Sequence, residues 1–185
     1  MKFFTSDLHL GHKKIAEYSG YPHVDLMNLA IIQAPLDVRQ PNDDLYILGD
    51  LSFCNADITN KFLSRLKGIN LYLILGNHDN EKLIKKISHH FVWIKDYYHM
   101  KIKDEDKNQH LILFHYPMLT WDRAHYGTWQ IHGHCHGSLF DDHESTRIDV
   151  GWDVWCRPIA FEDIKRYMWS RDYKVVDHHH YGSEG

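Results

Sequence analysis

Cysteine and long apolar runs are scarce in this chain of 185 residues. Its three cysteines include no Cys-x-x-Cys pair, and their odd number argues against a disulfide framework and for free thiols in a reducing compartment. No apolar run is long enough for a transmembrane helix, and the opening MKFFTSDLH lacks the apolar stretch of a secretory signal. The sequence therefore predicts a cytoplasmic protein without membrane association.

Positive charge is also in short supply. Lysine and arginine total 21 against 25 aspartates and glutamates, which gives a formal net charge of −4. Proteins that follow long duplex nucleic acid through many phosphates are usually basic, so this balance argues against such a partner. Repeats, low-complexity segments and linkers are absent as well. The length fits one domain over residues 1–176, with a flexible tail, DHHHYGSEG, over 177–185.

Apolar patterning predicts an architecture that changes along the chain. The first half alternates strands and helices, with strands over 2–6, 45–48 and 71–75 and helices over 13–18, 26–33, 56–66 and 81–87. The second half has strand patterns over 92–102, 110–116, 128–136 and 146–152, then a helix over 161–169. Pro35 should bend or end the second helix. This order predicts an α/β (α+β) four-layer sandwich, in which two mixed sheets pack face to face and are flanked by helices.

What the chain has in excess is histidine, with 17 residues, and several of them stand where apolar runs stop. Polar clusters follow the predicted strands as DLH at 7–9, GD at 49–50, GNHD at 76–79, a single histidine at 115 and GHCH at 133–136. Sites in α/β sheets lie at the carboxyl ends of strands, so we expect these clusters to meet at one edge. On an extended chain, Asp7 and His9 would face the same way, as would His134 and His136.

Each of these residues taken singly has an ordinary structural explanation. Asp7 can cap a helix, Asp50 and Asn77 can form turns, and His115 can be a hydrogen-bonded histidine of the core. Taken together, two aspartates, one asparagine and four histidines make a set of oxygen and imidazole ligands that suits Mn²⁺, Fe or Zn²⁺. Seven ligands exceed the needs of one metal with an open position. They match two metals that share a carboxylate and act on a phosphate.

The order of these motifs resembles the signature of the calcineurin-like metallophosphoesterases, which is D-x-H, G-D, G-N-H-[DE], a single H and G-H-x-H. The matches run from Asp7 to His136, and the closing segment DVGWDVWCRPIAFEDI is similar to the end of small bacterial and phage-type members. The resemblance implies two metal positions bridged by Asp50. It implies that the ligands of the first metal are Asp7, His9 and His136. It implies that the ligands of the second metal are Asn77, His115 and His134.

The same resemblance implies a catalytic role for His78, which would contact the phosphate and stabilise charge or protonate the leaving oxygen. Asp79 would then cap the following helix. Many members have G-D-x-x-D, whose second aspartate orients the catalytic histidine, whereas GDLSF places Phe53 at that position. Something else must then orient His78, and a backbone carbonyl is one candidate.

Two further side chains are candidates for substrate contact. His12 follows the first ligand pair and can reach a phosphate, or it can be a solvated residue at a helix start. Arg123 stands in the polar and aromatic segment TWDRAHYG, which can touch substrate or simply cover a sheet.

The resemblance implies a phosphoesterase that uses two divalent metals and attack by a metal-bridging hydroxide. Mn²⁺ is the favoured ion, with Fe, Zn or Ni as alternatives. The short segments between the motifs indicate an open site that tolerates two substituents on phosphorus, so we expect a phosphodiesterase acting on small or nucleotide-type phosphate esters. The alternatives are a phosphomonoesterase, a nucleotide hydrolase and a non-catalytic module that binds metal or nucleotide.

Overall fold

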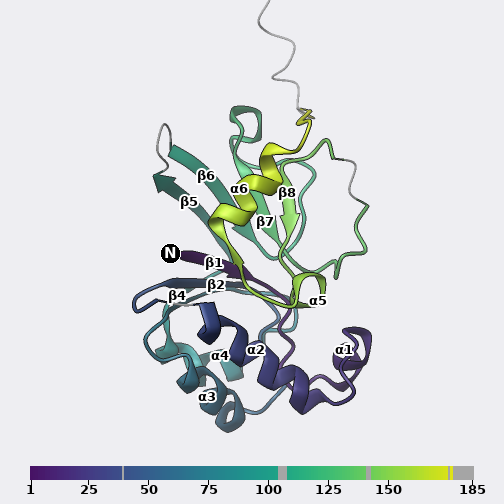
Figure 1. Ribbon diagram of the computed structural model, residues 1–185. Helices are drawn as coiled ribbons and strands as arrows, with labels where there is room; N and C mark the ends of the chain where they lie inside the picture. The colour runs from purple at the N-terminus through teal and green to yellow at the C-terminus, as the bar shows by residue number, and fades with distance from the viewer. Residues whose placement is uncertain (39, 104–107, 141–142, 175, 177–185) are drawn as a thin grey trace, which may run out of the picture.

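Two β-sheets pack face to face in the computed structural model, which describes residues 1–38, 40–103, 108–140, 143–174 and 176 (Figure 1). The first sheet has the strand order β4-β3-β2-β1-β9 and the second has the order β5-β6-β7-β8. The strands are β1 (Lys2–Thr5), β2 (Asp44–Leu48), β3 (Asn70–Ile74), β4 (Phe91–Lys95), β5 (Tyr97–Lys103), β6 (Asn108–Phe114), β7 (Trp129–His132), β8 (Arg147–Asp149) and β9 (Ile159–Ala160). The helices are α1 (Lys13–Tyr18), α2 (Val24–Val38), α3 (Ala56–Arg65), α4 (Glu81–Ile87), α5 (Trp152–Trp155) and α6 (Phe161–Trp169), with 3₁₀ turns η1 (Ser88–His90) and η2 (Ala124–Tyr126).

The first sheet is parallel apart from β9, which runs antiparallel to β1. Its strands are buried on both faces, because one core lies between this sheet and the helices and another lies between the two sheets. Successive side chains of a strand therefore point alternately into the two cores. In β2, Leu45 and Ile47 face the core under the helices, whereas Tyr46 and Leu48 face the core between the sheets. Parallel pairing puts the carboxyl ends of β1, β2 and β3 at one edge of the sheet.

Helices α1 to α4 cover the outer face of the first sheet (Figure 1). Their buried residues include Met27 and Ile31 of α2, Leu63 of α3 and Ile87 of α4. Removing each such side chain from water stabilises the fold by about 1.5–3 kcal/mol, so this helical layer holds the sheet and its polar edge in place.

The second sheet pairs β5 with β6 antiparallel, whereas β6, β7 and β8 are parallel. Leu111 and Leu113 of β6 face the core between the sheets, to which α6 adds Ile164 and Met168. On the other face of β6, Ile112 packs against Trp121 of the segment that leads into η2. Both sheets are mixed, and the predicted two-sheet sandwich is confirmed.

Several predicted elements have the wrong extent. Helix α2 continues through Pro35 to Val38. Proline removes one hydrogen bond, to the carbonyl of Ile31, and here the ring is buried on the core side. The range 92–102 is two strands, β4 in the first sheet and β5 in the second, because one apolar alternation runs across a change of sheets. The ranges 128–136 and 146–152 end early as strands, at His132 and Asp149.

Other predictions were accurate: the helices over 13–18, 81–87 and 161–169 have the observed bounds. The predicted tail over 177–185 lies outside the described residues. In the part of the chain that the structure describes, none of the helices combines the length and apolarity needed to cross a bilayer.

Candidate two-metal site

The polar clusters after β1, β2 and β3 are joined by backbone hydrogen bonds. Asp7 N–H donates to the carbonyl of Gly49 at 3.0 Å, and His9 N–H donates to that of Asp50 at 2.9 Å. The second sheet brings its residues to the same place, since His134 N–H donates to the Asp7 carboxylate at 2.9 Å. Loops that are distant in sequence therefore meet at one end of both sheets.

The first cluster is formed by Asp7, His9 and His136, whose ligand atoms lie within 4.8 Å of one another. His9 Nε2 is 3.7 Å from Asp7 Oδ1 and 3.7 Å from Asp50 Oδ2, and His136 Nε2 is 4.0 Å from Asp7 Oδ1. Ligands bound at about 2.0–2.2 Å stand roughly 3–3.5 Å apart around an ion. These separations fit an ion after small movements of the side chains.

The second cluster is formed by Asn77, His115 and His134. Asn77 Oδ1 lies 3.0 Å from both His115 Nε2 and His134 Nδ1. His115 Nε2 is also 3.6 Å from Asp50 Oδ2. Asp50 therefore stands between the two clusters, close to a histidine of each, which is the position that a bridging carboxylate needs.

Buried polar atoms in the first cluster test whether these residues fit a metal. Asp7 Oδ1 and both ring nitrogens of His9 are buried and have no hydrogen-bond partner among the described residues. Leaving such atoms unpaired costs about 1–3 kcal/mol each, and native proteins rarely do so without a bound ion or water. A divalent cation between the carboxylate oxygen and an imidazole nitrogen would satisfy both.

The second cluster gives an independent test. His115 Nδ1 lies 2.7 Å from the carbonyl of Leu48. A carbonyl only accepts, so Nδ1 carries a hydrogen, and in the tautomer whose only ring hydrogen is on Nδ1 the other nitrogen, Nε2, presents a lone pair to Asn77 Oδ1. Two acceptors that face each other repel unless a cation lies between them. Both clusters therefore fit a metal.

Burial changes the protonation of the first cluster. It raises the pKa of the Asp7 carboxyl to about 6, although the Ser6 hydroxyl and nearby histidines act in the opposite direction. Burial also lowers the pKa of His9 to about 4 and shifts the pKa of His134 downward. At neutral pH the Asp7 carboxylate is thus mostly ionised and the His9 imidazole is neutral, which are the forms that bind metal.

Asp153 is the main functional candidate that the sequence did not single out. Its Oδ2 accepts a hydrogen bond from His136 Nδ1 at 2.7 Å, and this bond raises the pKa of His136 to about 9. Metal-binding histidines usually donate their second nitrogen to a carboxylate or a carbonyl, which fixes the ring. The only sequence signal is the position of Asp153 in the closing segment DVGWDVW.

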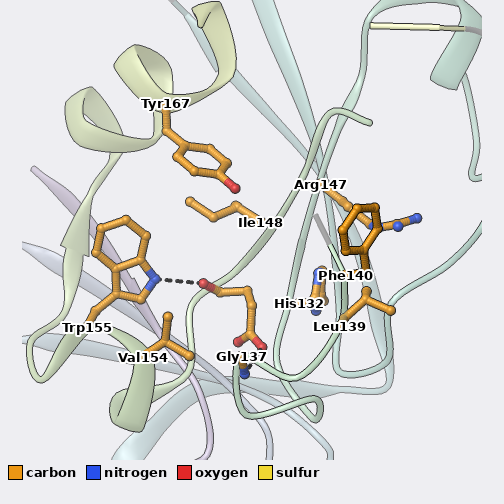
Figure 2. Close-up of a pocket in the computed structure, with 10 residues that line it drawn as sticks. His132, Gly137, Leu139, Phe140, Arg147, Ile148, Val154, Trp155 and Tyr167 are labelled. Atoms are coloured by element: carbon orange, nitrogen blue, oxygen red, sulfur yellow. Dashed lines mark hydrogen bonds between the residues drawn. The ribbon is translucent and has the colours of Figure 1, made fainter. Parts of the chain in front are cut away.

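The helix that carries Asp153 is itself held in place. The indole N–H of Trp155 donates to the carbonyl of Asp149 at 2.7 Å, the bond that is drawn as a dashed line from Trp155 in Figure 2. The Asp149 carboxylate accepts from the backbone N–H groups of Gly137 and Gly151. A cavity of about 160 Å³ lies beside this support (Figure 2), and none of the seven candidate ligands lines it.

Asp153→Asn should weaken the protein in a pH-dependent way when metal is chelated. The folded-state pKa of His136, about 9, lies above its unfolded value near 6.5, so the pair stabilises the fold fully below pH 6.5. That stabilisation is lost as the pH rises through about 9. In EDTA, we expect urea unfolding to show a larger gap between wild type and variant at about pH 6 than at about pH 10.

Metal affinity gives the second readout of the same variant. We expect calorimetric titration with Mn²⁺ to show affinity about 10- to 100-fold weaker, because His136 loses its orienting partner. Asp172→Asn, at an exposed aspartate, is the control. An equal stability gap at both pH values, together with unchanged Mn²⁺ affinity, would contradict the role of Asp153.

The backbone of the site is strained. Five of the seven candidate ligands have left-handed φ angles: Asp7 (54°), His9 (43°), Asp50 (56°), His134 (71°) and His136 (49°). The expectation that 7–9 and 134–136 are extended is therefore wrong. Such conformations cost about 1–3 kcal/mol each and persist where the surrounding structure enforces them, often at functional sites.

Gly133 shows how closely the loops approach. A Cβ at this position would lie 1.8 Å from Ser6 Oγ and 2.3 Å from Asp7 Oδ2. Only glycine lets the loop after β7 come near enough for His134 N–H to reach the Asp7 carboxylate.

Asp79 has a different role from the one predicted. The cap of α4 is Asn80, whose side chain accepts from the N–H groups of Lys82 and Leu83. The partly buried carboxylate of Asp79 accepts from the N–H groups of Gly76, Asp50 and Leu51 at 2.8, 3.0 and 2.9 Å. It therefore ties the loop after β3 to the loop after β2. Burial raises its pKa.

His78 is exposed at the solvent side of the clusters. Its backbone N–H donates to Asp50 Oδ1 at 2.9 Å, and its ring centroid lies 5.2 Å from that of Phe53 and 5.8 Å from that of His9. Among the described residues no carbonyl accepts a hydrogen bond from the imidazole. The ring of His78 packs against Phe53, which is 46% exposed, and the suggested backbone carbonyl is therefore not its partner among the described residues.

The two substrate candidates lie in different surroundings. His12 caps α1, where its Nδ1 accepts from Ile15 N–H at 3.2 Å, and its ring packs on Phe53 beside the site. Arg123 lies over the ring of Tyr126 at 5.1 Å, in the segment that covers the second sheet.

Tyr116 is an aromatic residue beside the second cluster that the sequence did not point to. Its ring lies 4.7 Å from that of His134.

Comparisons with known proteins show relatives along most of the chain. No family model matches. The chain is 27% identical to the Gene 66 protein of Mycobacterium phage L5 over 96% of its length and 95% of that protein. It is 29% identical to an uncharacterized protein of Methanocaldococcus jannaschii, over 76% of this chain and 72% of that one. A crystal structure of a protein of unknown function from Aquifex aeolicus has the same fold, with a TM-score of 0.65 at 24% identity over 90% of this chain and 98% of that chain.

Proposed function

We propose that this protein is a metal-dependent phosphoesterase of the calcineurin-like type that prefers phosphodiesters of small or nucleotide-type substrates. The observation that carries the proposal is the pair of clusters on either side of Asp50, formed by Asp7, His9 and His136 and by Asn77, His115 and His134. The buried Asp7 Oδ1 and His9 ring nitrogens, which have no hydrogen-bond partner among the described residues, support it, because a cation would satisfy the oxygen and one of the nitrogens. The order of the motifs from Asp7 to His136 supports it as well.

The donor set favours a metal that binds oxygen and nitrogen. Asp7, His9 and His136 would hold one ion, and Asn77, His115 and His134 the other, with Asp50 shared. Cys135 lies between two of these histidines, but burial raises the pKa of its thiol, so the thiolate form is disfavoured. Carboxylate, amide and imidazole ligands suit Mn²⁺, with Fe, Zn or Ni as alternatives. Two such ions would act as Lewis acids on phosphoryl oxygens and lower the pKa of water towards about 7.

The protein's own groups would position the reaction. His78 stands on the exposed side of the clusters, where its imidazole can donate to a phosphoryl oxygen or to the leaving oxygen. Its backbone bond to Asp50 places it relative to both clusters. The Asp153 carboxylate and the Leu48 carbonyl orient the rings of His136 and His115.

The arginines near the motifs support a diester substrate. A phosphomonoester dianion needs cations to hold its extra charge. Arg123 packs over Tyr126, Arg147 donates to the carbonyl of Met118, and Arg157 pairs with Asp163 at 3.1 Å. All three therefore have partners away from the clusters. A diester carries one negative charge and two substituents, so it needs fewer cationic side chains to hold it.

The test compares two chromogenic substrates in Mn²⁺-loaded protein. We expect kcat/KM for a bis-aryl phosphate to exceed that for the matching aryl monophosphate by about tenfold or more, and EDTA should abolish both activities. A monoester preference would overturn the diesterase assignment. Absence of any EDTA-sensitive hydrolysis would overturn the enzymatic proposal and favour a module that only binds metal or nucleotide.

A further inference from the structure

A groove of about 420 Å³ opens directly beside His78. It runs from the loop after β2 and the start of α3 along α4 as far as Lys86. Its lining includes His78, Phe53, Asn55, Asn80, Lys82 and Lys86. Because His78 and Phe53 also border the clusters, the groove is continuous with the proposed catalytic site.

Two cations lie along one wall of this groove. Lys82 and Lys86 are four residues apart on α4, so their side chains project from the same face of the helix. Neither forms an ion pair with another described residue. Their neighbour Lys85, in contrast, pairs with Glu81 at 2.7 Å. The groove therefore presents two uncompensated positive charges in a row that leads away from His78.

An aromatic ring stands at the end of the groove next to the clusters. Phe53 is held through its contacts with His12 and His78, at ring-centroid distances of 4.5 and 5.2 Å, yet 46% of the residue is exposed. A fixed ring followed by cations is the combination that binds unpaired bases and their phosphates. Every base has an apolar face, so such a platform takes different bases.

We propose that this groove binds the nucleotide next to the scissile phosphate of a single-stranded nucleic acid. The base stacks on Phe53, and successive phosphates contact Lys82 and then Lys86. This inference rests on the proposed function, since it places the scissile phosphate at the two clusters. Paired bases in a duplex cannot lie on Phe53, and the net charge of −4 disfavours a long duplex.

The test measures binding without turnover, with a short fluorescent oligothymidylate whose phosphorothioate linkages resist hydrolysis. In Mn²⁺-loaded protein, Lys82→Ala/Lys86→Ala should raise the Kd by about tenfold and reduce the slope of log Kd against log salt by about 1.4, as expected for two lost contacts. Phe53→Leu, which keeps an apolar side chain but removes the ring, should raise the Kd by about tenfold as well.

The matched control is Lys85→Ala/Lys101→Ala, which removes the same charge from a paired lysine of α4 and an exposed lysine of β5. We expect the Kd of this control for the oligonucleotide to stay within about twofold of wild type, because salt screens the attraction between distant lysines and the phosphates. Equal effects of the two double variants, or tighter binding of a duplex than of the single strand, would overturn the inference.

Hydrolysis of the bis-aryl phosphate by wild type separates the two proposals. If wild type hydrolyses the bis-aryl phosphate but the Lys82 and Lys86 substitutions weaken oligonucleotide binding no more than the control does, the proposed binding groove is overturned and the phosphoesterase proposal stands. Binding that depends on these lysines in a protein without hydrolysis overturns the phosphoesterase and leaves a single-strand binding groove.

Discussion

If the proposed two-metal site is correct, Asp50→Ala should remove both metals at once. Asp50 Oδ2 lies 3.7 Å from His9 Nε2 and 3.6 Å from His115 Nε2, so one carboxylate serves both clusters. Losing a supporting partner outside the ligand set typically costs 10- to 100-fold in affinity, and losing a shared ligand should cost more than about 100-fold at each position. We expect elemental analysis to find fewer than about one metal per chain, and phosphodiester turnover to fall by more than about 100-fold.

Asp50→Asn is the matched variant for this measurement. It keeps the shape and one oxygen of the side chain but removes the charge, so we expect an intermediate loss of metal. Circular dichroism in EDTA must show the fold of both variants intact, because Asp50 is buried between two loops. Two tightly bound metals in Asp50→Ala would reject the shared-carboxylate arrangement.

The meeting of the clusters could be predicted because it follows from strand direction. Asp7, Asp50 and Asn77 come directly after neighbouring parallel strands, and parallel strands end at one edge. The position of Asp153 could not be predicted in the same way. It lies 17 residues from His136, and their contact depends on how α5 docks against the loop after β7. No local pattern in the sequence records such docking.

The limits of the fold prediction have a similar cause. Helices α4 and α6 were predicted correctly because each is an amphipathic segment, and Asn80 also caps the start of α4. The switch of sheets between β4 and β5 leaves the apolar alternation intact, so periodicity alone does not reveal it. The apolar pattern of a strand shows which of its faces is buried. It does not show to which sheet the strand belongs, because that depends on pairing with strands distant in sequence.

The left-handed bends were hidden for another reason. Asp7 and His134 are not glycines, and locally they prefer other conformations. The bends exist because contacts distant in sequence enforce them, including the bond from Asp7 N–H to Gly49 and the bond from His134 N–H to the Asp7 carboxylate. In the proposed metalloenzyme, this strain would hold the candidate ligands in place before a metal binds.

His78→Ala should separate metal binding from catalysis. The imidazole hydrogen-bonds to none of the described residues, and it is the backbone N–H that contacts Asp50, so the variant keeps that contact. We expect unchanged metal content and a loss of turnover of about 10²–10⁴-fold. His89→Ala, which removes an exposed histidine just beyond α4, is the control and should leave turnover unchanged. Loss of metal, or unaltered turnover, would show that the role given to His78 is wrong.

The dependence of that loss on the leaving group distinguishes the two chemical roles of His78. A nitrophenolate departs without a proton, whereas an alkoxide needs one, so a general acid matters more for the alkyl ester. If His78 donates a proton, His78→Ala should reduce kcat at least about tenfold more for a dialkyl phosphodiester such as a dinucleotide, whose leaving group is an alkoxide, than for a bis-nitrophenyl phosphate. Equal losses for both substrates would instead indicate that His78 stabilises charge on the phosphoryl oxygens, which develops whichever group leaves.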